Sequence, residues 1–415
     1  MKNNRTFLEK LLDGAEVEWK TVKSLCNDNF WLMPATPEFD DNGTIPYITS
    51  KNIKGGKIDF QNTKYINEHV YQELSRTRCI IENDILISMI GTIGEAVIVK
   101  KEDLFFYGQN MYILRLNNKL VNYKFFLYYF TAPFILNSLL SKKNSSNQGY
   151  LKAGQIENLK IPIPPLSVQT EIVKILDALT ALTSELTCEL ILRQKQYEYY
   201  REKLLSEEEL GKVGGKWKNL KDVLINLRTG LNPRNNFKLN TDGADNYYIT
   251  VRELDSVNIK ITDKTDKISN QAREIIDKRS KLNIGDILFS GTGTIGKTAF
   301  ISELPRNWNI KEGVYALTVN QEIIKPMYLL RLLQSEITKK QINNFVMGST
   351  VKSISMADLK KVKILIPSLD EQQRIVSILD KFEALTNPIT EGLPLAIEQS
   401  QKRYEYYREL LLSFS

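Results

Sequence analysis

The amino-acid sequence predicts an α+β protein with a pseudo-two-fold internal repeat, in which two tandem mixed α/β domains are separated by two long antiparallel coiled-coil helices. Three observations lead to this fold class. The hexapeptide YEYYRE occurs at residues 197–202 and again at residues 404–409 of a chain of 415 residues. Shorter matches, such as GTIG at residues 91–94 and 293–296, recur at a similar separation of roughly 200 residues. The segment that ends each copy has the residue spacing of a coiled coil.

The segments within each copy follow in the same order. Each copy opens on a tryptophan-containing segment and continues with short β-like runs, which are preceded by the turn sequences Asn42-Gly43 in the first copy and Asp242-Gly243 in the second. A strand, a Gly-Thr loop and a second strand come next. They are followed by an aromatic-rich helix that we expect to fill a core and by a strand that carries proline. The paired segments are residues 17–25 and 215–223, 84–100 and 286–302, 123–130 and 326–333, and 159–166 and 362–369.

The helical segments after these prolines carry the coiled-coil pattern. From Val168 to Leu204 the seam positions step by four and three residues in alternation, with one stutter at Leu186. A continuous helix of this length would extend roughly 55 Å. The second copy repeats the pattern, but Pro388 and Pro394 interrupt it, and we expect a kink or a break there. Because one helix cannot bury its apolar stripe alone, the simplest arrangement pairs the two helices antiparallel. The expected domains are residues 1–166 and 211–369, with the central helix at 167–210 and the distal helix at 370–415, kinked at 387–394.

The composition is that of an ordinary globular protein, and it limits the kinds of partner and functional site that the chain can have. With 56 Lys and Arg against 49 Asp and Glu, the net charge of +7 fits a polyanionic partner without requiring one. The three cysteines show neither disulfide nor metal-site spacing. His69 is the single histidine, so a His-rich metal site is excluded, and we interpret this residue as an ordinary helix residue. The N-terminal sequence lacks a signal-peptide pattern and no apolar run reaches the ~18 residues of a membrane span. We therefore expect a cytoplasmic protein with no membrane contact.

Residues 291–298, GTGTIGKT, match the phosphate-binding motif G-x-x-x-x-G-K-[ST] after an apolar strand. Three features argue against a nucleotide site. The sibling loop has Met89 and Glu95 in place of Gly291 and Lys297. The residues after Lys297 favour a strand rather than the helix whose N-terminus would hold phosphate. No apolar run that ends in a suitable Mg²⁺-binding aspartate stands out downstream.

The same loop contains Phe289-x-Gly291-x-Gly293, which is similar to the methyl-donor loop of DNA methyltransferases. Such enzymes also need an Asn/Asp-Pro-Pro-aromatic segment at the flipped base, and the sequence has none. Paired carboxylates and Cys-His arrangements are also missing from the sequence pattern. We therefore expect no catalytic site in this chain.

Polar and basic loops provide candidate nucleic-acid contacts. Residues 49–54 and 250–252 follow the paired Tyr-Ile dipeptides and carry amide, hydroxyl and cationic groups that can reach base edges or phosphates. A solvated surface remains the alternative for each single residue. The candidate DNA-binding residues are Thr49, Ser50, Lys51, Asn52, Lys54, Thr92, Lys142, Lys143 and Gln148 in the first copy, and Thr229, Arg234, Thr250, Arg252, Thr294, Lys297 and Lys352 in the second.

The two junctions between globular segment and helix carry a resemblance to a known family. Each has a proline shortly before a leucine, a glutamine three residues after that leucine (Gln169 or Gln372), and then the motif I-x-x-I-L-D. With the duplication and the YEYYRE segments, the chain resembles the DNA-specificity subunits of Type I restriction-modification enzymes over essentially its whole length. Thr229-Gly230 matches a Thr-Gly loop often found early in these domains, whereas the first copy has Trp31-Leu32 at about that place.

The resemblance implies a function as well as a fold. Members of the family use two target-recognition domains, each of which reads one half of a split DNA sequence. Two antiparallel helices hold these two domains apart. The implied partners are double-stranded DNA, two methyltransferase subunits and the restriction/translocase subunits. The chain itself is expected to be non-catalytic and to hold no cofactor, with S-adenosylmethionine and ATP bound only by partner subunits. The alternative is a protein-interaction scaffold that does not read DNA.

The two YEYYRE segments are the candidate docking sites for the methyltransferase subunits, because identical segments suggest the same partner bound twice. The alternative is that their tyrosines are seam residues that pack only within the helix pair. The candidate partner-binding residues are Tyr197, Tyr200, Arg201, Tyr404, Tyr407 and Arg408.

Overall fold

The computed structural model describes residues 7–91, 93–141, 150–234, 236–305, 307–348, 351–386 and 392–414. It forms two compact units. Unit 1 consists of Met1–Leu186 together with Ile397–Ser415, and unit 2 consists of Thr187–Ala396. The last helix of the chain therefore belongs to the same unit as the first strands.

Unit 1 contains two larger sheets and two strand pairs. Before the long helix its elements are α1 (Phe7–Leu12), β1 (Glu18–Thr21), η1 (Val22–Leu25), β2 (Cys26–Leu32), β3 (Ile45–Ile48), η2 (Ser50–Asn52), β4 (Ile53–Lys54), β5 (Lys57–Ile58), β6 (Lys64–Ile66), α2 (Glu68–Ser75), β7 (Ile85–Ser88), β8 (Ala96–Ile98), η3 (Lys101–Asp103), β9 (Tyr107–Gly108), β10 (Met111–Leu116), α3 (Tyr123–Phe130), α4 (Pro133–Ser141), α5 (Ala153–Glu157) and β11 (Lys160–Ile163). One sheet has the order β2-β10-β7-β8 and is antiparallel. The other has the order β6-β3-β9, with β3 and β9 parallel. The pairs are β1 with β11 and β4 with β5.

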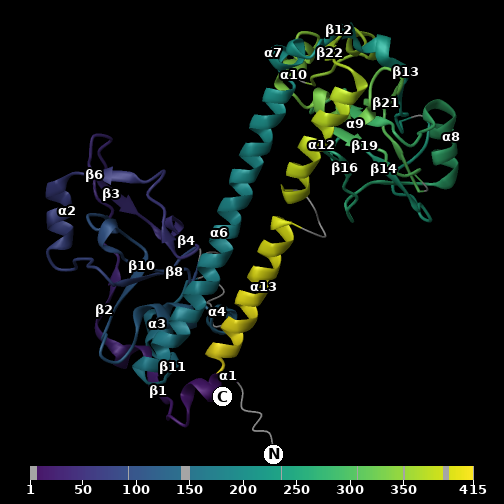
Figure 1. The fold of residues 1–415 in the computed structure, drawn as a ribbon. Coiled ribbons are helices and arrows are strands. Elements are labelled where there is room, and N and C mark those ends of the chain that lie inside the picture. The colour runs from purple at the N-terminus through teal and green to yellow at the C-terminus, as the bar shows by residue number, and fades with distance from the viewer. Residues whose placement is uncertain are drawn as a thin grey trace, which may run out of the picture. The chain divides into compact units, whose positions relative to one another are not determined.

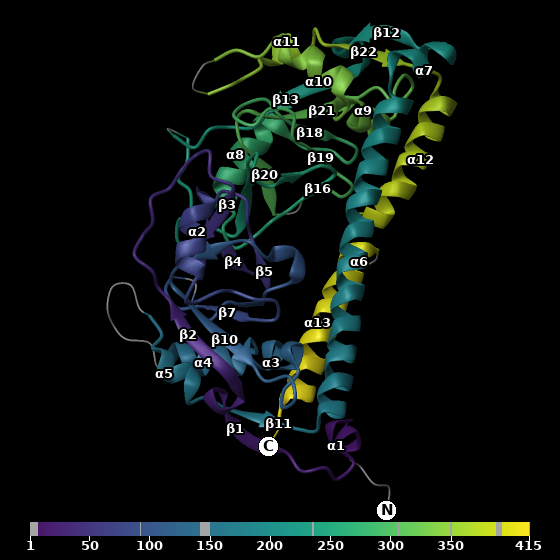
Figure 2. The same cartoon turned by 90° about the vertical axis from the view of Figure 1, so that its left-hand side faces the viewer.

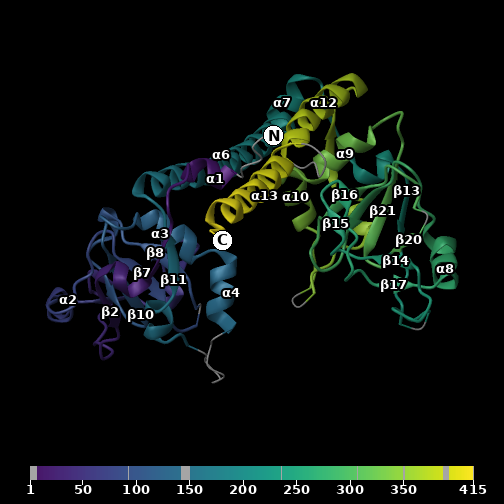
Figure 3. The ribbon, with the colours of Figure 1, turned by 90° about the horizontal axis from the view of Figure 1, so that it is seen from below.

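Unit 2 repeats this topology strand for strand. Its elements are α7 (Glu207–Lys212), β12 (Lys216–Asn219), η4 (Leu220–Val223), β13 (Leu224–Thr229), β14 (Asn246–Ile249), β15 (Leu254–Asp255), β16 (Asn258–Ile259), β17 (Lys267–Ile268), α8 (Asn270–Ser280), β18 (Ile287–Ser290), β19 (Thr298–Phe300), β20 (Trp308–Ile310), β21 (Val314–Val319), α9 (Pro326–Leu333), α10 (Glu336–Asn343), α11 (Met356–Leu359) and β22 (Lys363–Ile366). The sheets are β13-β21-β18-β19 and β17-β14-β20, and the pairs are β12 with β22 and β15 with β16. Figure 3 shows α8 beside β20.

The central strands of each four-stranded sheet are buried on both faces, which explains why they read as apolar runs without alternation. In β7, Ile85 and Ile87 belong to the core that also contains α3, whereas Leu86 between them points into a second core under the three-stranded sheet. In β18, Ile287 and Leu288 divide in the same way. Each unit therefore has a core on each side of this sheet, and unit 2 has a third, smaller cluster around Tyr248.

The aromatic-rich helices fill the first of these cores, as predicted. α3 begins where the side chain of Asn122 accepts hydrogen bonds from the backbone N–H groups of Lys124 and Phe125. Its residues Phe126 and Phe130 are fully buried and their rings stack. α9 begins at Pro326, a residue that suits the first position of a helix.

Three helices complete the units. They are α6 (Leu166–Leu204), α12 (Leu369–Thr386) and α13 (Leu393–Leu412). Figures 1 and 2 show α13 along the first part of α6 and α12 along its second part. The hydroxyls of Thr183 and Ser400 lie 2.8 Å apart within unit 1, and the rings of Tyr200 and Phe382 stack within unit 2. The distal segment consists of two helices, and residues 387–391, which include Pro388, lie outside the described residues.

Candidate nucleic-acid interface

Five loops of unit 2 meet at one end of its sheets. Backbone hydrogen bonds join them: Gly291 N donates to Gly313 O at 2.7 Å, and Gly293 N donates to Lys352 O at 2.8 Å. The loop around GTIG is thereby tied to the turn before β21 and to the segment that precedes α11. We call this surface the loop edge of unit 2, and it comprises residues 229–234, 250–253, 291–297, 311–313, 347–348 and 351–354.

The Thr-Gly sequence at residues 229–230 holds two loops of this edge together. A Cβ on Gly230 would lie 1.8 Å from Ile310 O, so no larger residue fits there without a backbone shift. The hydroxyl of the buried Thr229 accepts from Gly313 N at 3.0 Å and donates to Val314 O at 3.2 Å. Thr229 therefore shapes the loop edge from inside.

Two buried tyrosines support the same edge from below. Tyr248 donates its phenolic hydrogen to Leu231 O at 2.6 Å, and Tyr315 donates to Ile354 O at 2.7 Å. Burial raises the pKa of both phenols, so they stay protonated and keep their donor role at neutral pH.

Unit 1 has an equivalent loop edge. Met89 N donates to Asn110 O at 3.3 Å, Leu151 N donates to Met89 O at 3.1 Å, and Gln109 N donates to Ile48 O at 3.1 Å. These bonds join the loops in the same way as in unit 2. The loop edge of unit 1 comprises residues 49–55, 89–91, 93–95, 108–110 and 150–151.

The candidate residues of unit 2 divide into buried and exposed groups. Thr250 is buried, and its hydroxyl donates to Glu253 Oε2 at 2.7 Å while its backbone N–H donates to the same oxygen at 2.8 Å. Its hydroxyl is thus used within its own loop, whereas that of Thr229 is used by Gly313 and Val314. The exposed candidates of unit 2 are Arg234, Arg252, Thr294, Lys297 and Lys352.

Arg252 has a side chain that is 57% exposed, but its guanidinium is already engaged. Nη2 lies 2.7 Å from Asp266 Oδ2, and Nε lies 3.8 Å from Glu253 Oε1. A base or phosphate that binds Arg252 would have to compete with the Asp266 carboxylate.

In unit 1, Lys51 and Lys54 are exposed beside a short 3-10 turn. The amide oxygen of Asn52 accepts from Thr49 N at 2.9 Å, and Asn52 Nδ2 donates to Asp59 O at 3.0 Å. Asn52 and Thr49 therefore hold the turn that presents the two lysines. Ser50 is buried against β7, and Thr92, Lys142, Lys143 and Gln148 lie outside the described residues.

The GTGTIGKT segment is a loop between two antiparallel strands. β19 follows Lys297 directly and pairs with β18, so the predicted strand is confirmed and no helix N-terminus meets the loop. The hydroxyl of Ser290 accepts from Lys297 N at 2.8 Å and donates to Thr294 O at 2.5 Å. At the sibling position in unit 1, the Glu95 carboxylate accepts from Gly55 N at 3.2 Å.

The YEYYRE segments lie on α6 in unit 2 and on α13 in unit 1. The partner-binding candidates Tyr197, Tyr200, Arg201, Tyr404, Tyr407 and Arg408 are all half-buried. In each segment the arginine lies over the first tyrosine ring, at 5.5 Å for Arg201 over Tyr197 and at 5.9 Å for Arg408 over Tyr404.

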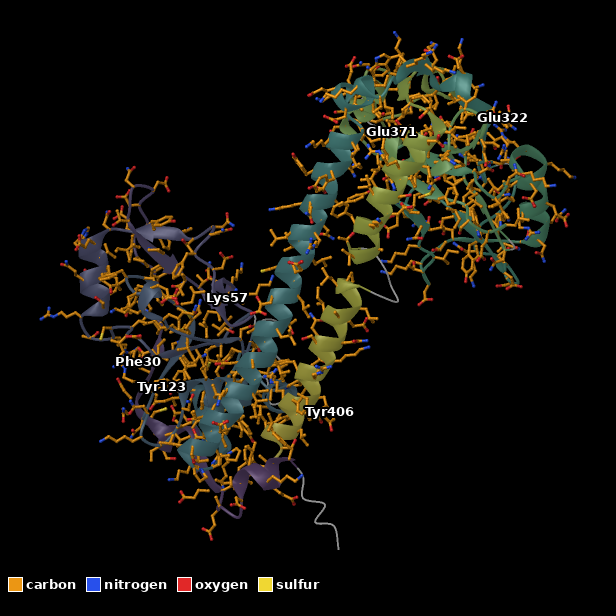
Figure 4. The ribbon with its side chains drawn as sticks, in the orientation of Figure 1. Phe30, Lys57, Tyr123, Glu322, Glu371 and Tyr406 are labelled. Atoms are coloured by element: carbon orange, nitrogen blue, oxygen red, sulfur yellow. The ribbon has the colours of Figure 1, made fainter. Side chains whose placement is uncertain are left out.

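The middle tyrosine of each motif is the exposed one, which the sequence pattern did not single out. The side chains of Tyr199 and Tyr406 are 60% and 63% exposed, and Figure 4 shows Tyr406 projecting from α13. Tyr199 borders a surface hollow of about 590 Å³ between α6 and α10. The tyrosine at the same position of the motif is therefore exposed in each unit.

A buried arginine was also missed. Arg331 lies on the otherwise apolar α9, is fully buried, and pairs with Glu383 and with Asp380, the latter at 3.0 Å. Its Nη1 donates to Tyr197 Oη at 3.2 Å. The guanidinium thus ties α9 to both α6 and α12. In the sequence, the signal that could have predicted this pairing was the presence of two carboxylates on α12.

Within the described residues there is no group of three or more His, Cys, Asp and Glu side chains that could hold a metal ion. In the same part of the chain, no helix is long and apolar enough to cross a membrane.

Comparison with known proteins identifies the family. The sequence model of the Type I restriction modification DNA specificity domain matches residues 15–193 and again residues 214–399. The chain belongs to this family. Because one domain model matches twice, the internal repeat predicted from YEYYRE and GTIG is confirmed, and the two tandem mixed α/β domains are those of Type I specificity subunits.

Curated relatives agree with this assignment, and solved structures share the fold. A putative type I restriction enzyme specificity subunit from Haemophilus influenzae is 40% identical over the whole of both chains. The EcoR124I/EcoR124II specificity subunit of Escherichia coli is 32% identical over 99% of this chain and 97% of its own. The crystal structure of the S subunit from M. genitalium shares the fold, with a TM-score of 0.53, 16% identity, and coverage of 97% of this chain and 98% of that one. A chain from a type I R-M system solved for its complex assembly gives a TM-score of 0.56 at 17% identity, with 96% and 98% coverage.

Proposed function

We propose that this specificity subunit binds double-stranded DNA through the two loop edges, each of which reads one half of a two-part target. The observation that carries the proposal is that the two edges share one backbone scaffold but differ in their exposed side chains. Glu95 in unit 1, which is half-buried, stands where the exposed Lys297 stands in unit 2. Two loop edges with the same backbone arrangement and different side chains suit two different halves of a DNA target.

Exposed cations at both edges support binding to a polyanion. Lys51 and Lys54 in unit 1, and Lys297 and Lys352 in unit 2, are exposed near loop backbones that are fixed by hydrogen bonds. Lysines of this kind contact phosphates, whereas hydroxyl, amide and guanidinium groups in the same loops can reach base edges. Affinity from such contacts falls steeply with salt concentration.

The same proposal includes the partners. Two methyltransferase subunits dock at the two YEYYRE segments, and restriction/translocase subunits join the complex. The support is that the two segments present the same exposed tyrosine, Tyr199 or Tyr406, beside the same half-buried ring and arginine. Chemistry then resides on the partners, which bind S-adenosylmethionine and ATP, and this chain contributes the choice of sequence.

One experiment tests the proposal against the alternative of a scaffold that does not read DNA. The full chain is expressed with its methyltransferase subunits, and the methylated positions across a genome are sequenced. We expect one two-part motif with a fixed spacer, and binding of a duplex with this motif that weakens as salt is raised. Absence of DNA binding by the complex would support the scaffold instead. Methyl transfer by the purified single chain would contradict its non-catalytic role.

A further inference from the structure

An exposed apolar pair stands out on the loop edge of unit 2. Met347 and Val351 have side chains that are 69% and 60% exposed, although both lie in a segment whose backbone is paired. Met347 N donates to Ser353 O at 2.9 Å, and Ser353 N donates to Met347 O at 2.8 Å. The two residues between Gly348 and Val351 lie outside the described part of the chain.

The described residues of the paired segment are hydrogen-bonded to the GTIG loop. Gly348 has φ +100°, and a Cβ there would lie 2.3 Å from Val351 O, so the turn requires glycine. Gly293 N donates to Lys352 O at 2.8 Å, which joins the segment to the loop that carries the exposed Thr294. Met347 and Val351 therefore flank backbone groups that are hydrogen-bonded within the loop edge.

We infer that Met347 and Val351 contact the 5-methyl group of a thymine in the half-site that unit 2 reads, and this inference rests on the function proposed above. The thymine methyl is the distinctive apolar group that base edges present in the major groove, and apolar side chains recognise it. The neighbouring exposed residues complete a surface suited to DNA. Lys297 and Lys352 are cationic, Thr294 is polar, and Glu312 is the exposed acid of the turn before β21.

The size of Val351 favours a methyl contact over insertion between bases. Side chains that separate stacked bases are bulky and long enough to reach past the base edge. Val351 is short and β-branched, so its two methyl groups stay close to the backbone of the paired segment. Contact with a methyl at the base edge needs no such reach. A pair of apolar side chains can close around one methyl group and exclude water from it.

A thymine-to-uracil scan tests the inference, because uracil lacks only the methyl group. The full chain in complex with its methyltransferase subunits is first shown to bind the intact target. Duplexes are then compared in which each thymine of the unit 2 half-site is replaced singly by deoxyuridine. Loss of one buried methyl should weaken wild-type binding about fourfold at one position.

Variants identify the side chain responsible. In Val351→Ala or Met347→Ala, the intact target should bind more weakly, and the uracil substitution at the responsive position should have little further effect. Ile284→Ala is the matched control, since Ile284 is 59% exposed but precedes β18 at the end opposite the loop edge. This control should keep the full fourfold response.

The outcomes separate the two proposals. If the wild-type complex binds no target specifically, the proposed function is wrong. If it binds specifically but no uracil substitution matters, or the half-site contains no thymine, only the thymine contact is wrong. An unchanged fourfold response in both Val351→Ala and Met347→Ala also overturns it, because the methyl group would then be read by another residue.

Discussion

The side chains of Gln169 and Gln372 make the same three hydrogen bonds in the two units. Both are fully buried. In unit 1, Oε1 of Gln169 accepts from Asn122 N at 2.8 Å, and Nε2 donates to Leu120 O at 3.2 Å and to Pro164 O at 2.8 Å. The glutamine thereby fixes the entry of α6 against the loop before α3.

In unit 2, Gln372 repeats the set with Lys325 N at 2.8 Å, Ile323 O at 3.1 Å and Pro367 O at 3.0 Å. One buried amide therefore satisfies three backbone groups in each unit. The glutamine that the sequence pattern placed at the helix entry is thus a structural residue.

Gln372→Leu should destabilise unit 2 by about 2–4 kcal/mol, because a backbone N–H group and two carbonyls lose their buried partner. Denaturant unfolding followed by circular dichroism measures the change. Gln373→Leu is the matched control at the exposed neighbouring position, and it should change stability by less than about 0.5 kcal/mol. Equal effects of the two substitutions would contradict this role of Gln372.

The stability of unit 1 should depend on pH through Tyr112 and Glu157. Tyr112 donates to Glu157 Oε1 at 2.5 Å, and this bond is the main reason that the pKa of Glu157 lies below its ordinary value of 4.5. A carboxyl group with a lowered folded-state pKa stabilises the fold above its unfolded pKa, and this contribution is lost as the pH falls through the folded pKa.

Tyr112→Phe should therefore lower the free energy of unfolding at pH 7 by about 1.5–3 kcal/mol, the range for a hydrogen bond to a charged group. The difference from wild type should shrink as the pH falls below about 4. Urea titrations at pH 7 and pH 3 provide the comparison. The same difference at both pH values would show that the Glu157 carboxylate is not involved.

Tyr199→Ala and Tyr406→Ala should each remove one methyltransferase subunit from the complex. An exposed aromatic anchor at an interface is worth about 2 kcal/mol or more, which corresponds to roughly 30-fold weaker binding. Native mass spectrometry at low micromolar concentration should show one partner per chain for each variant. Leu304→Ala, which changes a 56% exposed residue outside the helices, should retain two. Two retained partners in the double tyrosine variant would refute docking at these residues.

Arg252→Ala should relax or abolish recognition in only one half of the target, at about 1–3 kcal/mol for a lost contact to a base. Asp266→Ala should have the opposite effect on affinity, because it releases the guanidinium from its ion pair. Methylome sequencing of each variant reads both halves at once. Uniform weakening on all sequences would make Arg252 a phosphate contact.

Four residues inserted between Leu186 and Thr187 should lengthen the non-specific spacer of the target by about one or two base pairs. The insertion adds about 6 Å of helix at ~1.5 Å per residue, against ~3.4 Å per base pair along a strand. The boundary between the units falls there, so neither core is altered, and the stutter tolerates the change. Methylation at the original spacing by a folded, active variant would show that the length of α6 does not set the length of the spacer.

The sequence predicted those features that depend on local chemistry. The strand after Lys297 follows from β-branched and aromatic residues, and the helix at residues 123–130 follows from its apolar spacing. The duplication was visible because a repeated segment needs no three-dimensional information to be recognised.

The remaining features depend on tertiary packing. Thr229 and Thr250 have side chains that suit a base contact, yet both hydroxyls are used inside the protein. The hydroxyl of Thr229 accepts from Gly313 of another loop, which comes near only in the fold, and that of Thr250 donates to Glu253 of its own loop. The seam spacing assigned Tyr197 and Tyr200 to the helix interface but could not show how far Tyr199 would stay exposed, since this depends on what α10 leaves uncovered. A charged residue such as Arg331 is unexpected in an apolar helix, and its role is explained only by the fold, which brings Glu383 beside it.

The division of the chain also sets an order of folding during synthesis. Unit 2 is one continuous stretch of sequence, whereas the core of unit 1 includes Leu411 and Leu412 of α13 and Phe414 just after it. Unit 1 therefore completes its core only after α13 has been made, whereas unit 2 can complete its core earlier. Until then the apolar face that α13 will cover stays open, so unit 1 is the part of the nascent protein most exposed to aggregation.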